Sequence, residues 1–183
     1  MLQLSLQQIE KWDPVLEEFF YTGCDGELLL EHSLISISKW EQKYKKPFLS
    51  KDMLKKITDD ELMFYIKCMT MNHPDPRIYD SLTDNDVTKI LKYCNDSNTA
   101  TTINNRASSH GRQEIMTSEV IYSYMVLLGI PFECQKWHIN RLLTLISVVN
   151  IKQQKPQNMS KRNILSQNKN LNAARRRISG SKG

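Results

Sequence analysis

Hydrophobic residues recur every three or four positions over residues 114–151, a spacing that predicts two helices. A side-chain oxygen of Thr117 or Ser118 can cap the first helix. Gly129 suits a left-handed residue just past its end, and Pro131 cannot donate the next helical bond, so the chain turns there. The second helix has an apolar stripe broader than a simple surface helix needs, and we expect it to be buried on two sides. Residues 114–151 are therefore expected to form the centre of the core.

The N-terminal residues show the patterns of strands. Leucines alternate with polar residues over positions 2–6, which is typical of a half-buried strand. After a connection through residues 12–14, residues 18–21 and 27–31 are predicted to be two further strands. They are joined by residues 22–26, a turn with two glycines and an aspartate. We expect a small three-stranded antiparallel sheet that packs its leucines on a helix, because such a sheet is marginal alone.

Between the sheet and the helix pair, local signals predict further helices. One begins at Ser33. Thr58 and Glu61 have the spacing of a capping box and open a strongly apolar helix. Pro76 can start a short helical turn, and Thr83 precedes another helix with acidic residues in its first turn.

The expected fold is an α+β protein, mostly α-helical, with a small N-terminal sheet packed on a helical domain and a basic C-terminal helical extension. Residues 1–151 are expected to form a single α-rich domain. Its parts are a sheet (1–32), helices (33–94), an exposed loop almost without apolar residues (95–113) and the central helix pair (114–151). Residues 152–183 are expected to be a basic linker and helix.

The formal charge of +5 is unevenly distributed along the 183 residues. Residues 1–133 hold 14 Lys and Arg and 20 Asp and Glu, a net charge of −6. Residues 134–183 hold 11 Lys and Arg and no acid, a net charge of +11. Such a tail could bind nucleic acid, an acidic protein surface or the acidic part of another copy, or could simply be solvated. No aromatic residue is interleaved to stack on bases. The basic residues of its predicted C-terminal helix are Lys161, Arg162, Lys169, Arg175, Arg176 and Arg177.

One side of the second central helix is a candidate partner-binding surface. Trp137, Arg141, Leu145 and Val148 follow one another at helical spacing, with a charge in the middle of the apolar stripe. The alternative is an ordinary core helix in which Arg141 pairs with an acidic residue from the front half of the chain.

Motifs for catalysis are not found in the sequence: GxSxG, GxxxxGK, HExxH and GxGxxG are all missing. Cys134 and His138 are four residues apart and could share a helix face, but no second pair at usable spacing completes a metal site. A buried thiol and a structural histidine explain them, as they do Cys68 and His73. We expect no enzyme activity, no cofactor, no metal and no small-molecule substrate.

The sequence also gives expectations about compartment. Four scattered cysteines favour reduced thiols over a disulfide framework. The N-terminus lacks the pattern of a secretory leader, and the longest apolar runs are shorter than a membrane span. We expect a soluble intracellular protein that does not engage a membrane.

Several strings of residues resemble those of proteins encoded among the tail genes of tailed bacteriophages, described as tail assembly chaperones or uncharacterised tail proteins. The resemblance covers most of the chain outside residues 95–113. The strings are LEHSLISISKWE (30–41), KPFL (46–49), YIKCM (65–69), GIPFECQKWH (129–138), NRLLTLI (140–146), MSKR (159–162) and LNAARR (171–176).

This resemblance implies a non-enzymatic assembly factor that coats the tape measure protein, keeps it soluble and helps to recruit tail tube subunits. It would act in the host cytoplasm during phage assembly. Opposite charges at the two ends of the chain favour contacts between copies, and hence a homo-oligomer. Two alternatives stay open: a structural protein retained in the virion, for example at a connector or baseplate, and a nucleic-acid-binding accessory protein that uses its basic tail.

Overall fold

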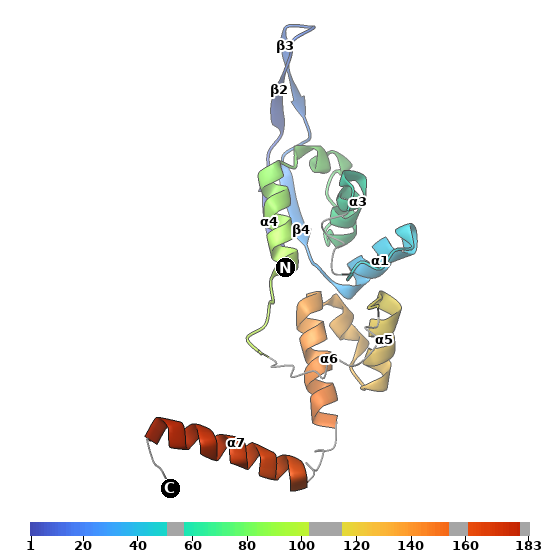
Figure 1. The fold of residues 1–183 in the computed structure, drawn as a ribbon. Coiled ribbons are helices and arrows are strands. Elements are labelled where there is room, and N and C mark those ends of the chain that lie inside the picture. The colour runs from blue at the N-terminus through green and yellow to red at the C-terminus, as the bar shows by residue number, and fades with distance from the viewer. Residues whose placement is uncertain (51–56, 103–114, 154–160, 180–183) are drawn as a thin grey trace. The chain divides into compact units, whose positions relative to one another are not determined.

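The computed structural model divides into two compact units, Met1–Val149 and Asn150–Gly183, which are described separately (Figure 1). Helices predominate over strands, so the expected mixed and mostly helical class is confirmed. The expected loop at 95–113 lies largely outside the described residues. The structure describes residues 1–50, 57–102, 115–153 and 161–179.

Within the described part of the chain, the strands form two antiparallel pairs. β1 (Leu2–Leu6) pairs with β4 (Gly26–Leu30), and β2 (Ile9–Asp13) pairs with β3 (Glu18–Thr22). The expected three-stranded sheet is therefore wrong. Its supposed hairpin turn joins strands of different pairs, because β3 turns back onto β2 and β4 pairs with β1. The two pairs follow one another as halves of a long ribbon (Figure 1).

The β1–β4 half of the ribbon covers the core. Its leucines at alternating positions are buried on one face, where α3 and α4 pack. The residues after α3 cover the outer edge of β4: the Met71 N–H donates to the Leu29 carbonyl at 2.7 Å, and the Glu31 N–H donates to the Met69 carbonyl at 2.9 Å. β4 is thus held on both sides.

The helices begin where their capping residues predict. Ser33 caps α1 (Leu34–Tyr44), and Thr58 forms a complete capping box with Glu61 at the start of α3 (Asp59–Met69). Pro76 opens the 3-10 helix η1 (Pro76–Ser81), and Thr83 caps α4 (Asp84–Asn95). These expectations are confirmed because each cap supplies an acceptor for N–H groups that the first turn leaves free.

The central helix pair is present as α5 (Ser118–Leu127) and α6 (Ile139–Gln153), with the 3-10 helix η2 (Phe132–Lys136) between them. Gly129 adopts the expected left-handed conformation, with φ of 65°. The buried carboxylate of Glu41 in α1 accepts the N–H of Ser118 at 2.7 Å and that of Phe48 at 2.8 Å. One carboxylate therefore ties the start of α5 to α1.

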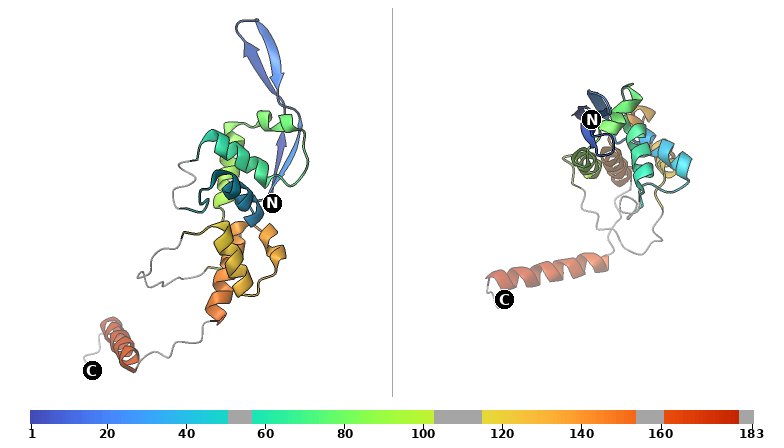
Figure 2. Two further views of the ribbon diagram at one scale, coloured as in Figure 1. Left: turned by 90° about the vertical axis from the view of Figure 1, so that its right-hand side faces the viewer. Right: turned by 90° about the horizontal axis from the view of Figure 1, so that it is seen from above.

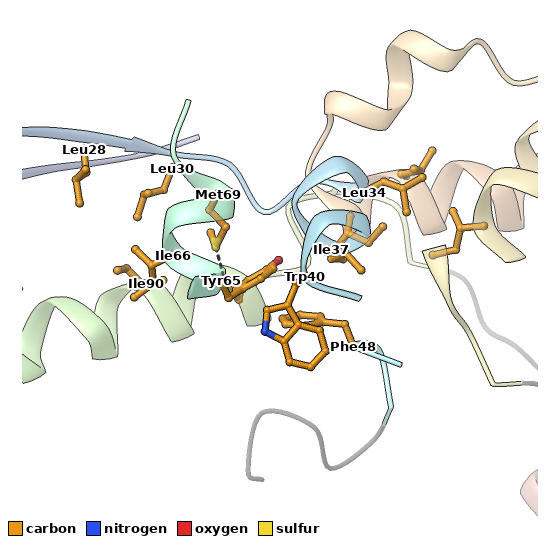
Figure 3. Packing of buried hydrophobic residues seen from close by; sticks show 14 of the residues in the cluster. Leu28, Leu30, Leu34, Ile37, Trp40, Phe48, Tyr65, Ile66, Met69 and Ile90 are labelled. Atoms are coloured by element: carbon orange, nitrogen blue, oxygen red, sulfur yellow. Dashed lines mark hydrogen bonds between the residues drawn. The ribbon is translucent and has the colours of Figure 1, made fainter. Parts of the chain in front are cut away.

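The centre of the core lies elsewhere than expected. β4, α1 and α3 contribute many of its fully buried side chains, and the Trp40, Phe48 and Tyr65 rings form its aromatic part (Figure 3). The ring centroids of Phe48 and Tyr65 are 4.1 Å apart, and the Trp40 Nε1–H donates to the Glu61 carbonyl at 3.1 Å. The α5–α6 pair adds to this core but does not form its centre, since α6 buries one face only.

The second unit contains α7 (Lys161–Ser179). Leu165 and Leu171, the larger apolar side chains described on this helix, are 69% and 54% exposed. Few apolar residues interrupt its polar surface, as is typical of a helix that needs another surface for stability.

Candidate functional site

The β2–β3 hairpin extends beyond the helices of its unit as a two-stranded arm (Figure 2). Asp13 shapes its turn, because Oδ1 accepts the N–H of Val15 at 2.8 Å and that of Leu16 at 3.3 Å. Glu17 then takes a positive φ of 53° and leads into β3. The turn closes without a glycine because side-chain hydrogen bonds replace backbone freedom.

One side of the hairpin, here called the aromatic face, consists of Glu10, Trp12, Phe19 and Tyr21. The register pairs Trp12 with Phe19 and Glu10 with Tyr21, and alternation places these two pairs on the same face. The Trp12 and Phe19 rings meet edge to face with centroids 4.8 Å apart. The Tyr21 hydroxyl donates to Glu10 Oε1 at 2.9 Å, and this hydrogen bond raises the pKa of Tyr21. Cross-strand pairs therefore order the face without help from a core.

The hairpin exposes an unusual amount of apolar surface. Six large apolar side chains are between 43% and 87% exposed, whereas the Trp40, Phe48 and Tyr65 rings are buried in the core. Phe20 lies on the opposite face from Trp12, Phe19 and Tyr21, so the hairpin exposes apolar surface on both faces. Exposed apolar patches mark surfaces that bind other molecules. The six residues are Trp12, Val15, Leu16, Phe19, Phe20 and Tyr21.

Charge adds a second property to the hairpin. Residues 9–22 contain four acidic residues and one lysine, a net charge of −3. A complementary surface would be apolar and basic, because electrostatic complementarity guides encounter and orientation. The charged residues are Glu10, Lys11, Asp13, Glu17 and Glu18.

The root of the hairpin is fixed to η1. The Cys24 N–H donates to Ser81 Oγ at 2.9 Å, and the Ser81 hydroxyl donates to the Cys24 carbonyl at 3.0 Å. Gly23 has φ of +79°, and a Cβ there would lie 2.8 Å from the Ser81 backbone nitrogen. Asp25 Oδ1 accepts the Gln8 N–H at 2.8 Å on the neighbouring connection. The close contact between Gly23 and Ser81 helps to fix the direction of the β2–β3 hairpin.

Of the predicted partner-binding residues, Trp137 precedes α6, and Arg141, Leu145 and Val148 lie on it. Trp137, Leu145 and Val148 are half-buried and Arg141 is exposed. The Arg141 guanidinium lies 4.3 Å from the centroid of the Trp137 ring. Within the described ranges Arg141 makes this cation–π contact and no ion pair, unlike in the alternative of an ordinary core helix, where it would pair with an acidic residue. The buried residues of α6 are Ile139, Leu142 and Ile146.

His138 is a structural residue in this arrangement. Its Nδ1 accepts the Asn140 N–H at 3.3 Å, so Nε2 carries the proton that is donated to the Tyr93 carbonyl at 3.1 Å. Burial lowers the pKa of His138. Both ring nitrogens are engaged, and Cys134 is buried. Across the described ranges, no group of three or more His, Cys, Asp and Glu residues could hold a metal ion.

The basic tail residues lie along α7. The side chains of Lys169, Arg175 and Arg176 are exposed. The positions of the side chains of Lys161, Arg162 and Arg177 lie outside the described part of the structure.

The hairpin is the feature that the sequence did not predict as a site. Residues 12–14 were assigned to a connection, although Asp13 followed by Pro14 is itself a turn signal. The aromatic residues at 19–21 were expected to lie in a sheet packed on a helix. Alternating residue types indicate a strand, but they do not say whether a helix covers it.

Comparisons of the chain with protein-family models, with curated proteins and with solved structures find no match. Among the helices that the structure describes, none is long and apolar enough to cross a membrane.

Proposed function

We propose that this chain is a protein-binding assembly factor that works without catalysis, and that the aromatic face of the hairpin is its main contact surface. The observation that carries the proposal is the exposure of Trp12, Phe19 and Tyr21 on an arm anchored at its root. Large rings with few rotatable bonds lose little entropy when they are buried in an interface, and they commonly dominate binding energy. A fixed root reduces the ordering cost further.

The partner is a protein with an apolar surface bordered by basic residues. The acidic residues around the aromatic face disfavour an anionic lipid surface, which attracts basic segments. They favour a polypeptide whose lysines or arginines surround a groove for the rings. The stripe of Trp137, Arg141, Leu145 and Val148 offers a second contact for the same partner or another one.

The resemblance to tail proteins of tailed bacteriophages suggests where this function is used. In that setting the chain is a tail assembly chaperone of the host cytoplasm that holds the tape measure protein and recruits tail tube subunits. Long helical proteins such as a tape measure need their apolar surface covered before assembly, and an exposed aromatic arm supplies matching surface.

Co-expression and affinity purification with tape measure and tail tube proteins test the proposal. The wild-type chain should retain the tape measure protein. Trp12→Ser combined with Phe19→Ser should reduce retention at least about tenfold, which corresponds to the loss of two interface anchors. Leu127→Ser removes an apolar side chain of α5 that is 75% exposed, more than Trp12 or Phe19, and serves as the control. Retention of neither protein by the wild-type chain contradicts the chaperone function.

Mass spectrometry of purified particles separates the chaperone from a structural virion protein. A chaperone is absent from mature particles, whereas a connector or baseplate component is present at a fixed copy number.

A nucleic-acid-binding function is the second candidate, favoured by the composition of α7. Residues 161–179 contain six basic residues and no acidic one. Binding to DNA through this helix would weaken steeply with salt and disappear on removal of residues 160–183.

A further inference from the structure

β1 has an unpaired edge. β4 lies along one side of β1, and along the other side no strand pairs with it in the part of the chain that the structure describes. Proteins usually cover, shorten or charge such edges, since their free N–H and C=O groups recruit other strands. β1 carries no lysine and no proline.

The hydrogen bonds of β4 identify the free groups of β1. The Leu29 N–H donates to Asn72 Oδ1 at 3.1 Å, and its carbonyl accepts the Met71 N–H at 2.7 Å, so Leu29 faces away from β1. The backbone N–H and C=O groups of successive residues point to opposite edges of an antiparallel strand, so those of Leu28 and Leu30 point toward β1. Their register partners on β1 face them in return. These partners are Leu4 and Leu2, and Leu6 opposite Gly26 continues the alternation. The backbone N–H and C=O groups of Gln3 and Ser5, which lie between these leucines, therefore point outward.

A groove runs beside this edge, between β1 and α4. Its volume is about 790 Å³, enough for side chains as well as a main chain. Leu2, Leu4 and Tyr93 supply apolar walls, and the exposed Lys92 lies on the α4 side. The edge therefore has both a ladder for a strand and space for its side chains.

We propose that a second copy of this chain occupies the edge, with the two β1 strands antiparallel about a two-fold axis at Leu4. This register pairs Gln3 of each copy with Ser5 of the other. Both are outward-facing residues, so all four pairs of hydrogen-bonding groups at these positions are satisfied. A register shifted by one residue would place inward-facing groups opposite outward ones. The result is one four-stranded antiparallel sheet across two copies.

The side chains fit the same register. Leu4 meets Leu4 of the second copy, and Leu2 meets Leu6 of the second copy, on the face that each copy already turns toward its core. The alternating pattern of β1 therefore continues across the axis and extends the buried leucine layer. An isologous contact of this kind closes as a dimer.

The charges on α4 favour a second copy over an unrelated strand. The Tyr93 hydroxyl donates to Glu31 Oε1 at 2.7 Å, and the N-terminal amine pairs with Glu31 Oε2 at 2.9 Å. The end of α4 therefore lies beside the start of β1, so the helix runs antiparallel to the strand. Asp86 pairs with Lys89 of its own copy at 2.9 Å, and the two-fold axis brings this pair toward Lys92 of the other copy. Lys92 has no ion pair within the described ranges, and all three residues line the groove.

This inference is independent of the hairpin function, because β1 and the hairpin are different halves of the ribbon. Sedimentation velocity of the full chain over a range of concentrations tests it. The wild type should show a reversible dimer. Ser5→Pro removes an outward N–H that the second copy would use, and it places a proline ring at the edge. It should raise the dimer dissociation constant at least about tenfold. Ser5→Ala keeps that N–H and should stay within about twofold of the wild type.

A second pair of variants tests the dimer independently, in case Ser5→Pro does not fold. Lys92→Glu places a carboxylate opposite Asp86 of the other copy and should weaken the dimer, most strongly at low salt. Lys39→Glu makes the same charge change at an exposed site on α1 and should leave the dimer unchanged. A wild type that stays monomeric at the highest concentration overturns the proposal. So does a dimer that folded Ser5→Pro and Lys92→Glu variants both leave intact.

Discussion

The two halves of the β ribbon have the same local structure and opposite environments. In the β1–β4 half, buried leucines at alternating positions pack on helices, whereas in the β2–β3 half the aromatic residues are exposed. The first half is stabilised by burial of apolar surface. The second is stabilised by cross-strand pairs and by its root, because a lone two-stranded hairpin is marginal in water. The two halves thus differ in whether helices cover them, and the proposed contact surface lies on the uncovered half.

The largest expected effect comes from truncating one side chain in each half. Leu28→Ala in β4 leaves a cavity at a fully buried position and should lower the free energy of unfolding by about 3 kcal/mol. Phe19→Ala in β3 should cost no more than about 1 kcal/mol, because it removes an exposed cross-strand pair. Urea denaturation of both variants measures the difference. Equal costs would show that the hairpin is covered in the free protein.

The next prediction concerns the root of the hairpin, where the two halves of the ribbon meet. Gly23→Ala puts a Cβ against Ser81 at a positive φ and should cost about 2–3 kcal/mol. Gly129→Ala is the matched control, since φ is +65° there but no atom lies within 4 Å of the added Cβ. It should cost only about 1 kcal/mol. Thermal unfolding of the pair separates backbone strain from steric overlap, and identical costs would argue against close packing at the root.

Acid should destabilise the core at the end of the β1–β4 half. His32 is buried beside His138 and bonded to the Tyr65 hydroxyl, and burial lowers its pKa to about 3. In the unfolded chain His32 is protonated with the ordinary histidine pKa of about 6.5. The free energy of unfolding is therefore highest above about pH 6.5 and decreases as the pH falls below that value. At about pH 5 the loss should be roughly 2 kcal/mol from His32. Urea titrations across this pH range measure the free energy of unfolding, and His32→Asn should reduce its dependence on pH. A pH-independent stability would contradict a buried neutral imidazole.

The smallest effect is expected at the hydrogen bonds of the root. Ser81→Ala removes both bonds to Cys24 and should cost about 1–2 kcal/mol. Ser123→Ala removes one exposed bond to the Val120 carbonyl and should change stability by less than about 0.5 kcal/mol. The rate of hydrogen exchange of the β2–β3 backbone amides should increase in Ser81→Ala but not in Ser123→Ala.

The sequence predicts the local structure well. The expected helices begin after Ser33, Thr58 and Thr83, and Thr117, one of the two candidates, caps α5. Gly129 takes the expected left-handed conformation. Each prediction depends on neighbouring residues only, so no tertiary contact can overturn it easily.

Strand pairing and burial could not be predicted in the same way. The glycines at 23 and 26 suggested a hairpin turn, yet Gly23 is required by the close approach of Ser81, a residue far along the chain. The true turn contains no glycine and depends on Asp13. The exposure of Trp12 and Phe19 is a tertiary property, since no α-helix in the described part of the chain packs over β2 and β3. The same limit explains why the core centre was placed at α5 and α6.

The central claim is that Trp12 lies at the partner interface, and acrylamide quenching of its fluorescence tests this most directly. In Trp137→Phe, the remaining tryptophans are buried Trp40 and half-exposed Trp12, so quenching reports on the hairpin. The free protein should be quenched readily, and addition of the co-purifying tape measure protein should protect Trp12. Quenching that stays the same in a demonstrated complex would contradict the account.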